Sequence, residues 1–283
     1  MVMTPSPIVL FSLWGFQGDL REAITTAATH GFDGLELNLH HPAIRSLDPA
    51  AVLERLADAK QQLVLELFTG GDYVPGLAIS PEQHLQDLDQ QLVQAAAFQP
   101  LRVTVLTGSD HWSWSVQQQF WSQVLERVAD APFPVSFETH RSRSFYSPWV
   151  MANYLEAFPG LRLTADLSHW CVVAERLMTP ALEPIRMIAP RVDHIHARVG
   201  HAQGPSVGHP FAPESQAALE AHAACWSLFA QRWSSSRCGP FTITPEFGPD
   251  GYLPQLPFTG QPVADLLQIN AAMAAWLRTE WRG

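Results

Sequence analysis

The sequence predicts a single α/β domain, a (β/α)8 TIM barrel over residues 1–283. The length of 283 residues is typical of one such barrel, and a hydrophobic content of 47% is enough for a large core. Short apolar, strand-like runs alternate repeatedly with longer amphipathic runs, as in a parallel sheet with a helix after every strand. No break in composition and no long flexible linker divides the chain, so we expect one domain.

The expected strands follow in order along the chain, with helix signals between them. They are Ile8–Trp14, Gly34–Leu39, Gln62–Phe68, Arg102–Leu106, Val135–Glu138, Arg162–Asp166, His194–Ala197 and Phe241–Glu246. Ser80-Pro81-Glu82-Gln83 gives one helix an N-cap, a proline in its first turn and a capping-box residue. Asp48-Pro49 opens another helix, and Gly31 follows the first helix where a left-handed backbone is common.

Within several expected strands, leucine-rich positions alternate with polar ones. In the second strand Leu35 and Leu37 share one face, and Glu36 lies on the other. In a barrel wrapped by helices the apolar face meets the helices, so the polar face points inward. Active sites of this fold lie at the carboxyl ends of the strands. Inward polar residues at those ends therefore indicate a site, because buried charges without a partner or a metal are costly.

Composition weighs against several classes of function. A net charge of -10 and a pI of about 5.6 disfavour a nucleic-acid partner but allow a small sugar. Cys171, Cys225 and Cys238 show no paired spacing, so we expect reduced thiols in a cytoplasmic protein. Met1–Leu10 has no Lys or Arg before its apolar run, which disfavours a secretory signal, and Asn270–Leu277 is too short to span a bilayer. We expect no membrane partner, while the oligomeric state, a homo-oligomer included, stays open.

Four expected strand ends carry residues of metal-ligand type: Glu138, Asp166, His196 and Glu246. Their spacings are roughly thirty residues or a little more, the length of one strand-plus-helix unit. Residues so far apart meet only if parallel strands deliver their carboxyl ends to one place. Three carboxylates and an imidazole there predict one divalent ion, Mn, Mg, Co or Zn. Glu138 and Glu246 are also candidate catalytic bases, because a metal-bound carboxylate stays ionised and its free oxygen can accept a proton.

Five further residues are candidates for substrate binding: His140, His169, Arg198, Trp14 and Glu36. The Asp166-x-x-His169 step could instead be an N-cap aspartate followed by a solvent-facing histidine. Arg198 follows His196 on the same face, at the rim, where it would bind a hydroxyl, carboxylate or phosphate, unless it is a surface arginine. Glu36 points inward from the second expected strand, and a deeper structural role is the alternative for it.

Other residues have structural interpretations beside the functional ones. His194 is expected to be a buried histidine bonded to its neighbours, and Glu66 a structural hydrogen-bond partner. An ion pair with Arg162 or another cation inside the barrel is the alternative role for Glu138 or Glu246. Aromatic residues after the strand ends predict either a sugar-stacking wall or core packing: Trp14, Phe68, Trp112, Trp114 and Trp170. The long loops expected to crown the site are Thr69–Ile79, Val199–Pro213 and Phe247–Pro262.

In this order and spacing, these residues resemble the xylose isomerase-like barrel superfamily, which includes sugar isomerases, epimerases and endonuclease IV-type proteins. The resemblance covers nearly the whole chain. It rests on Gly31-Phe32-Asp33-Gly34-Leu35-Glu36-Leu37, the Glu138 strand, Asp166-x-x-His169, His194-x-His196 and Glu246. The ketose 3-epimerase branch implies one divalent ion held by Glu138, Asp166, His196 and Glu246. In that branch the two glutamates move the proton, and the residue matching His169 touches substrate oxygens.

The chain departs from both branches of the superfamily. Ala202 stands where the epimerase branch has an arginine six residues after the metal histidine, so Arg198 is the candidate anchor here. The endonuclease IV branch needs histidines after strands two to four and an Asp-x-His after strand seven. Here Phe68-Thr69-Gly70 ends the third strand, and no Asp-x-His follows His196.

The leading hypothesis is a divalent-metal-dependent isomerase or epimerase, or a dehydratase, acting on a sugar or polyol-derived hydroxy-ketone. Its mechanism would be proton transfer through a metal-stabilised enediolate. One alternative is a metal-dependent phosphodiesterase like an AP endonuclease, and another is a non-catalytic sugar-binding barrel. The sequence does not decide between isomerisation, epimerisation and dehydration.

Overall fold

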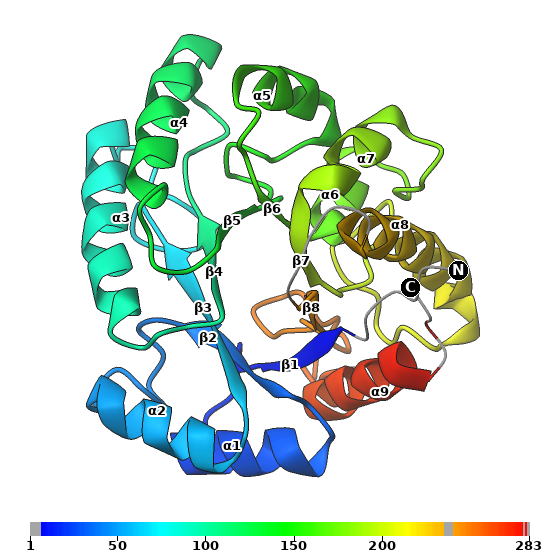
Figure 1. The fold of residues 1–283 in the computed structure, drawn as a ribbon. Coiled ribbons are helices and arrows are strands. Elements are labelled where there is room, and N and C mark those ends of the chain that lie inside the picture. The colour runs from blue at the N-terminus through cyan, green and yellow to red at the C-terminus, as the bar shows by residue number, and fades with distance from the viewer. Residues whose placement is uncertain (1–6, 235–239, 280, 282–283) are drawn as a thin grey trace.

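The computed structural model describes residues 7–234, 240–279 and 281. Its strands are all parallel and close into one barrel in chain order, with β8 pairing β1. Figure 1 looks into this barrel, with helices arranged around it. The predicted (β/α)8 fold is confirmed. The strands are β1 (Ile8–Ser12), β2 (Gly34–Asn38), β3 (Gln62–Phe68), β4 (Arg102–Leu106), β5 (Val135–Glu138), β6 (Leu163–Ala165), β7 (Val192–His196) and β8 (Thr242–Thr244).

The outer layer consists of α1 (Leu20–Thr29), α2 (Pro49–Asp58), α3 (Pro81–Ala96), α4 (Trp114–Val128), α5 (Met151–Ala157), α6 (Leu167–Val173), α7 (Glu183–Ile188), α8 (Gln216–Ser234) and α9 (Leu266–Thr279). Three short 3-10 turns join them: Pro148–Val150, Ala189–Arg191 and Pro213–Ser215. The predicted caps are confirmed. Ser80 and Gln83 form a capping box on α3, Asp48 caps α2, and Gly31 has a φ of 75° after α1.

Several strand ends differ from the prediction. The bounds of β3, β4 and β5 agree with it, whereas β1, β2, β6 and β8 end one or two residues earlier. Strand β7 begins two residues before its predicted start, at Val192, and ends one residue before its predicted end, at His196. Asp166 explains one difference, since it is the N-cap of α6 and accepts from the backbone N–H of Ser168 at 2.9 Å. Trp14, Asp166 and Glu246 therefore lie just beyond their strands, in the loops above the barrel.

The two faces of each strand are used as expected, with one exception. Leucines such as Leu35 and Leu65 point into the hydrophobic core between sheet and helices. Inside the barrel, the Thr164 hydroxyl lies 2.9 Å from that of Thr104 and 2.7 Å from that of Ser136. Arg162 is two residues before Thr164, so the period of two predicts that it also faces inward. This prediction is wrong, because its side chain is partly exposed and pairs with Asp193 at the amino end of β7.

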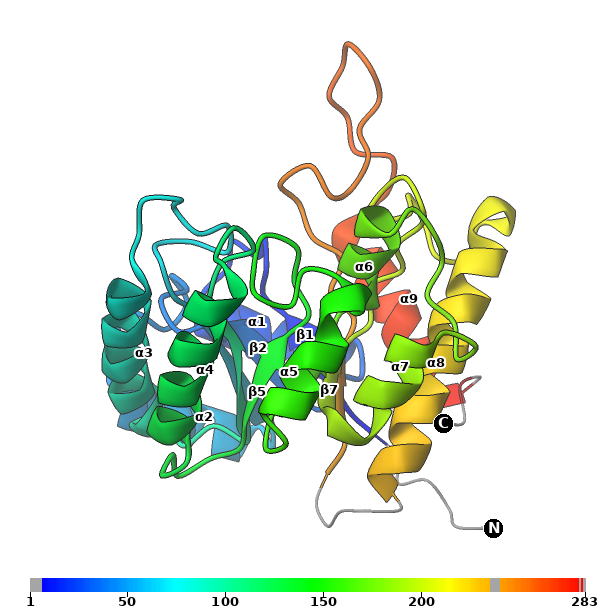
Figure 2. The ribbon, with the colours of Figure 1, turned by 90° about the horizontal axis from the view of Figure 1, so that it is seen from above.

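The loops after the strands rise on one side of the barrel. Figure 2 shows the segment after β8, in orange, projecting furthest on this side. No described helix is long and apolar enough to cross a membrane, and Asn270–Leu277 lies within α9. Cys171 and Cys225 are buried free thiols, as predicted, while Cys238 lies outside the described residues, as do residues 1–6 of the Met1–Leu10 segment.

Candidate active site

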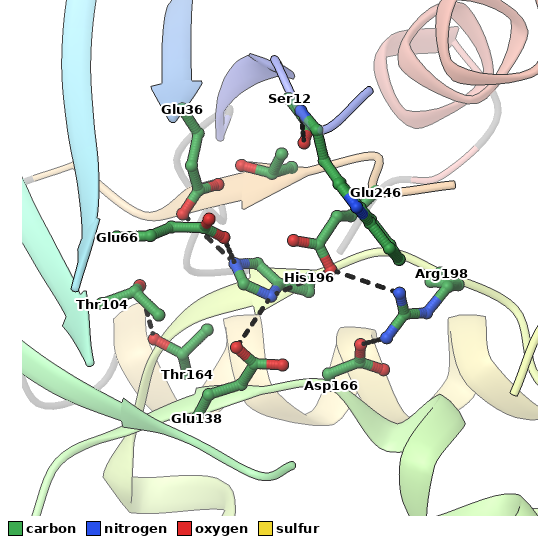
Figure 3. Close-up of polar contacts among 12 residues, drawn as sticks. Ser12, Glu36, Glu66, Thr104, Glu138, Thr164, Asp166, His196, Arg198 and Glu246 are labelled. Carbon is green, nitrogen blue, oxygen red and sulfur yellow. Dashed lines mark hydrogen bonds and ion pairs between the residues drawn. The ribbon is translucent and has the colours of Figure 1, made fainter. Parts of the chain in front are cut away.

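The four predicted ligand residues meet at the carboxyl end of the barrel. Glu138, Asp166, His196 and Glu246 each offer one ligand-type atom, and these atoms lie within 4.8 Å of one another. All four side chains are buried, with the two glutamates 5% and 6% exposed. In Figure 3, His196 lies centrally, with Glu138 and Glu246 on different sides of its ring. The structure thus brings together residues from β5, the β6 end, β7 and the β8 end.

The His196 ring is held so that one nitrogen faces the three carboxylates. Its Nε2 lies 3.2 Å from Oε1 of Glu36, and because a carboxylate only accepts, Nε2 carries the proton of this contact. Its Nδ1 lies 3.2 Å from Glu246 and 3.7 Å from Glu138. Among the described residues, this buried Nδ1 has no hydrogen-bond partner. Burial lowers the pKa of His196, but Glu246, Glu36 and Glu138 outweigh burial and raise it well above its usual value, so a cation at Nδ1 would replace a proton there.

Glu36 bridges the two histidines of β7. Its Oε2 accepts from Nε2 of His194 at 3.0 Å, and Nδ1 of His194 lies 2.7 Å from the Thr242 hydroxyl. His194 is therefore the neighbour-bonded buried histidine that was predicted. Both carboxylate oxygens of Glu36 are engaged with imidazoles, and Glu36 is 1% exposed. It lies below the cavity rather than on its wall, so its predicted substrate contact has no support in this geometry.

The carboxylates differ in their affinity for a proton. Burial, aided by Glu246 and Asp166, raises the pKa of Glu138 to about 7, with His196 opposing the shift. Burial together with Glu246 and Glu36 raises the pKa of Glu66 well above its usual value. Burial also acts on Glu246, but His196 and Arg198 outweigh it and lower its pKa. Two neighbouring carboxylates with opposite shifts are the pattern expected of an acid and base pair.

Arg198 is a buried cation beside the ligand cluster, only 2% exposed, which overturns its interpretation as a surface arginine. It forms an ion pair with Asp166, donates from Nε to the Ser168 hydroxyl at 2.9 Å and lies 3.7 Å from Glu246. Burial lowers its pKa, but Asp166 and Glu246 outweigh burial and raise it, so the guanidinium stays charged. Its other face packs over the Tyr252 ring, 4.5 Å from the centroid. Figure 3 shows Arg198 between Asp166 and Glu246.

Of the alternative ion pairs predicted for the glutamates, the one with Arg162 is wrong, whereas another buried cation, Arg198, does lie near Glu246. The guanidinium near Glu246 belongs to Arg198, and Arg162 is bound to Asp193. The other glutamate, Glu138, lies near a histidine instead, with its Oε1 3.7 Å from Nε2 of His169.

Two neutral imidazoles lie on the other side of Glu138. The rings of His140 and His169 are 3.9 Å apart at their centroids. Burial and nearby arginines hold the pKa of His140 well below its usual value, and burial and His140 do the same to His169. Nε2 of His169 accepts from Arg198 at 2.8 Å, and His169 is fully buried, so it is not solvent-facing. His140 lines the cavity, and His169 lies behind it.

A cavity of about 360 Å³ opens above the cluster. Its wall includes Glu138 and Glu246, together with Trp14, Phe68, Leu106, His140, Arg198, Tyr252 and residues of the loops after β2, β3 and β8. This volume lies in the range of small-molecule sites. As predicted, residues of the loops after β3 and β8 line the cavity. No residue of the third predicted loop, 199–213, lines it.

The predicted aromatic wall is only partly correct. Trp14 and Phe68 line the cavity. Trp170 is fully buried and donates to the Phe145 carbonyl at 2.8 Å. Trp112 packs against Phe120 and His84, and Trp114 against Tyr154, all away from the cavity. Single tryptophans after strand ends belong to the core more often than to a site, because their large area favours burial.

Sequence reasoning missed several residues of the cavity wall. Tyr252 is the most notable, since its ring makes an edge contact with Trp14 at 4.8 Å and lies between Arg141 and Arg198. Asp250 accepts from the Trp14 indole N–H at 2.9 Å and fixes the loop after β8 against the loop after β1. Both lie in a turn-rich loop, where no periodicity indicates which side chain faces inward.

The donor set fits a divalent cation. Ligand-type atoms of three carboxylates and a buried imidazole nitrogen lie within 4.8 Å of one another, a donor set that suits Mn, Mg, Co or Zn. A second group, Glu138, His140 and His169, also has close ligand-type atoms. There, however, Nε2 of His169 already accepts a hydrogen bond from Arg198.

The same fold occurs in solved structures. A probable 3-DHS dehydratase of Bacillus anthracis, involved in petrobactin synthesis, is 15% identical, with a TM-score of 0.64 over 97% of this chain and 99% of that one. D-allulose 3-epimerase from Methylomonas sp., in complex with D-allulose, is 15% identical, with a TM-score of 0.63 over 96% and 98%. A xylose isomerase domain protein from Alicyclobacillus acidocaldarius is 16% identical, with a TM-score of 0.61 over 98% and 99%.

At these identities the likeness establishes the fold alone, a (β/α)8 TIM barrel, and one of these structures is a xylose isomerase domain protein. No protein-family model and no curated protein matches this sequence.

Proposed function

We propose that this chain, a xylose isomerase-like TIM barrel in fold, is a divalent-metal-dependent isomerase or epimerase of a sugar or polyol-derived hydroxy-ketone. The observation that carries the proposal is the convergence of Glu138, Asp166, His196 and Glu246 within 4.8 Å, at the floor of a small-molecule cavity. Solved barrels of the same fold include an epimerase bound to a ketose and a dehydratase, which supports carbonyl chemistry on hydroxylated substrates.

A divalent ion held by these four residues would polarise a substrate carbonyl and stabilise the negative charge of an enediolate. The chain itself supplies the proton transfer. Glu138 and Glu246 both reach the cavity, and the carboxylate oxygen of each that does not hold the ion can take up and return a proton. We assign to them the removal of the proton next to the carbonyl and its return.

The remaining wall residues bind and orient the substrate. His140 is a neutral imidazole on the wall, able to donate to or accept from a hydroxyl. His169 lies behind it and we assign it a supporting role, as we do for Glu36 below His196. Trp14 and Tyr252 offer aromatic surface to the apolar face of a sugar.

The test begins with metal content by elemental mass spectrometry after reconstitution with Mn, Co or Zn. We expect about one ion per chain in the wild type and none in Asp166→Ala, because that variant loses one of four ligands. Asp58→Ala, at the exposed end of α2, is the matched control and should keep the ion. Absence of metal in the wild type under all three conditions would remove the proposal.

The second part of the test is deuterium incorporation from heavy water into a panel of ketoses. We expect exchange at the carbon next to the carbonyl, reduced by about a hundredfold or more in Glu138→Gln, since general acid–base groups contribute that much. Binding of ketoses without exchange would instead support the sugar-binding barrel.

A further inference from the structure

A second cavity adjoins the one above the carboxylate cluster. Its volume is about 550 Å³, and it lies between the loops after β2 and β3 and the helix α3. It shares four wall residues with the first cavity: Asn38, His41, Phe68 and Asp72. The remaining wall consists of His40, Gly71, Asp87 and Gln91, none of which the chemistry proposed above uses.

The polar side chains of this second cavity are held in place by the protein. Asp87 accepts from the backbone N–H of Gly70 at 2.7 Å, and Gln91 donates from Nε2 to the Phe68 carbonyl at 2.7 Å. Asn38 accepts from the backbone N–H of His40 at 2.8 Å. Bonds of this kind fix the side chains before a ligand arrives, which reduces the entropy lost on binding.

The Gln91 amide provides a further polar group beside this cavity. Gln91 is 7% exposed, and its Oε1 has no hydrogen-bond partner among the described residues. The amide is anchored through Nε2, and Oε1 is an acceptor, so it cannot bond to the same carbonyl. At Gly71, whose φ is 100°, an added Cβ would meet no atom within 4 Å, so the backbone there borders open space.

Charge and hydrogen-bonding type determine what this second cavity can bind. Its wall carries the carboxylates of Asp72 and Asp87 and the imidazoles of His40 and His41, and none of the described residues that line it is Lys or Arg. Carboxylates only accept hydrogen bonds, so they pair with hydroxyl groups and repel phosphate or carboxylate groups. Phe68, which borders both cavities, adds an apolar surface against which the carbon-bound face of a sugar ring packs.

We infer that the second cavity is a substrate subsite for an additional uncharged, hydroxyl-rich unit, that is, a second sugar joined to the reacting ketose. This inference rests on the proposed function, because the first cavity must hold the reacting unit. The substrate is then a glycosylated ketose rather than a free ketose or a sugar phosphate. The reacting unit lies over the carboxylate cluster, and the second sugar extends past Phe68 toward α3.

The test is isothermal titration calorimetry on the protein in the presence of Mn²⁺. The probes are the free ketohexoses, the disaccharides in which a glucose is linked to each of them (maltulose for fructose), and D-fructose 6-phosphate. We expect a disaccharide to bind at least about tenfold more tightly than its free ketose, because it adds contacts to a preformed wall. We expect the phosphate ester to bind no more tightly than fructose.

A variant that fills the second cavity gives the control. His40 is exposed and lines only the second cavity, so His40→Trp should abolish the tenfold advantage and leave ketose affinity within about twofold. His30→Trp places the same residue at the exposed C-cap of α1, and it should behave as the wild type.

The outcomes that contradict the subsite differ from the outcome that contradicts the proposed function. Equal binding of ketose and disaccharide, or tighter binding of the phosphate ester, would overturn the subsite and leave the proposed function standing. Unchanged disaccharide affinity in His40→Trp would also overturn it. No binding of any ketose or disaccharide would overturn the proposed function and the subsite together.

Discussion

Single residues of the site carry opposing charges that have to be balanced in a buried environment. Glu138, Asp166 and Glu246 place three carboxylates together, and Arg198 is the buried cation paired with two of them. Removing one partner of a buried ion pair is costly because the other charge is left without compensation. Arg198 thus stabilises the cluster independently of any contact with substrate.

Replacement of Arg198 tests this role. We expect Arg198→Met to lower the free energy of unfolding by about 3 kcal/mol in EDTA, as for other broken buried pairs. In saturating Mn²⁺ the loss should be clearly smaller, because a bound cation neutralises the same carboxylates. Urea unfolding followed by circular dichroism in both conditions measures the difference. An equal loss in both would mean that Arg198 acts only by packing against Tyr252.

Glu36 offers a second test at the residue scale. Its carboxylate accepts from His196 and thereby sets which nitrogen of that ring faces the cluster. Glu36→Gln keeps the size but provides an amide that can present a donor to Nε2, so the ring orientation is no longer fixed. We expect Mn²⁺ affinity, measured by competitive titration with a fluorescent chelator, to fall by about 10- to 100-fold. Wild-type affinity in this variant would show that Glu36 does not position His196.

Among the secondary-structure elements, the approach of β2 to β3 determines where Glu36 and Glu66 lie. Gly34 pairs with Gln62 at the start of this ladder, and a Cβ on Gly34 would lie 2.1 Å from the Gln62 carbonyl oxygen. No real Cβ contact is so short, and the obstructing atom belongs to the backbone. A glycine is therefore required by the register of these two strands.

Substitution of Gly34 should separate the two strands. We expect Gly34→Ala to lower the free energy of unfolding by about 3 kcal/mol, the upper range for a residue forced into a packed interior. Gly160→Ala is the matched control, because a Cβ there meets nothing within 4 Å, and its stability should change by less than about 1 kcal/mol. Chemical denaturation of both variants measures these free energies of unfolding. Similar losses of stability in the two variants would show that the sheet relaxes around the new methyl group.

At the scale of the whole molecule, His222 links the helical layer to the loop after β7. Its Nδ1–H donates to the Ala218 carbonyl at 2.8 Å, and its Nε2 accepts from the Gly200 N–H at 3.3 Å. The Cys171 sulfur lies 3.9 Å from Nε2, and Arg198 is the nearby cation. Burial lowers the pKa of His222 from 6.5 to about 4, with the Ala218 carbonyl opposing and Arg198 assisting.

This shift makes global stability depend on pH in a defined direction. Between pH 6.5 and 4 the unfolded chain binds a proton at His222 and the folded chain does not, so stability falls as the solution is acidified. From pH 7 to 5 this group should cost about 2 kcal/mol of unfolding free energy.

Urea unfolding of the wild type and His222→Gln at both pH values isolates this contribution, because all other titrating groups are common to the two proteins. We expect a shallower pH dependence in the variant. Parallel curves would mean that His222 is protonated in the folded state at pH 5.

Local sequence signals accounted for the elements and for the composition of the site. The period of two in β2 placed Glu36 inward and Leu35 outward, and the Ser80 capping box gave the start of α3. These features depend on neighbouring residues only, so they are readable from one sequence. The spacing of Glu138, Asp166, His196 and Glu246 predicted that they meet, and the structure brings them together; their role as metal ligands stays a prediction.

The tertiary structure alone decided which side chains share the cavity and what balances them. From the sequence, Arg198 was either a substrate contact at the rim of the barrel or a surface arginine. In the structure it is buried and forms an ion pair with Asp166. Tyr252 and Asp250 gave no signal, because a loop has no period that sets the direction of its side chains. The sequence by itself determined the barrel and the meeting of the strand ends, since these follow from local pattern and chain length. Burial, pairing and cavity shape are sums over contacts between distant segments, and only the folded chain defines them.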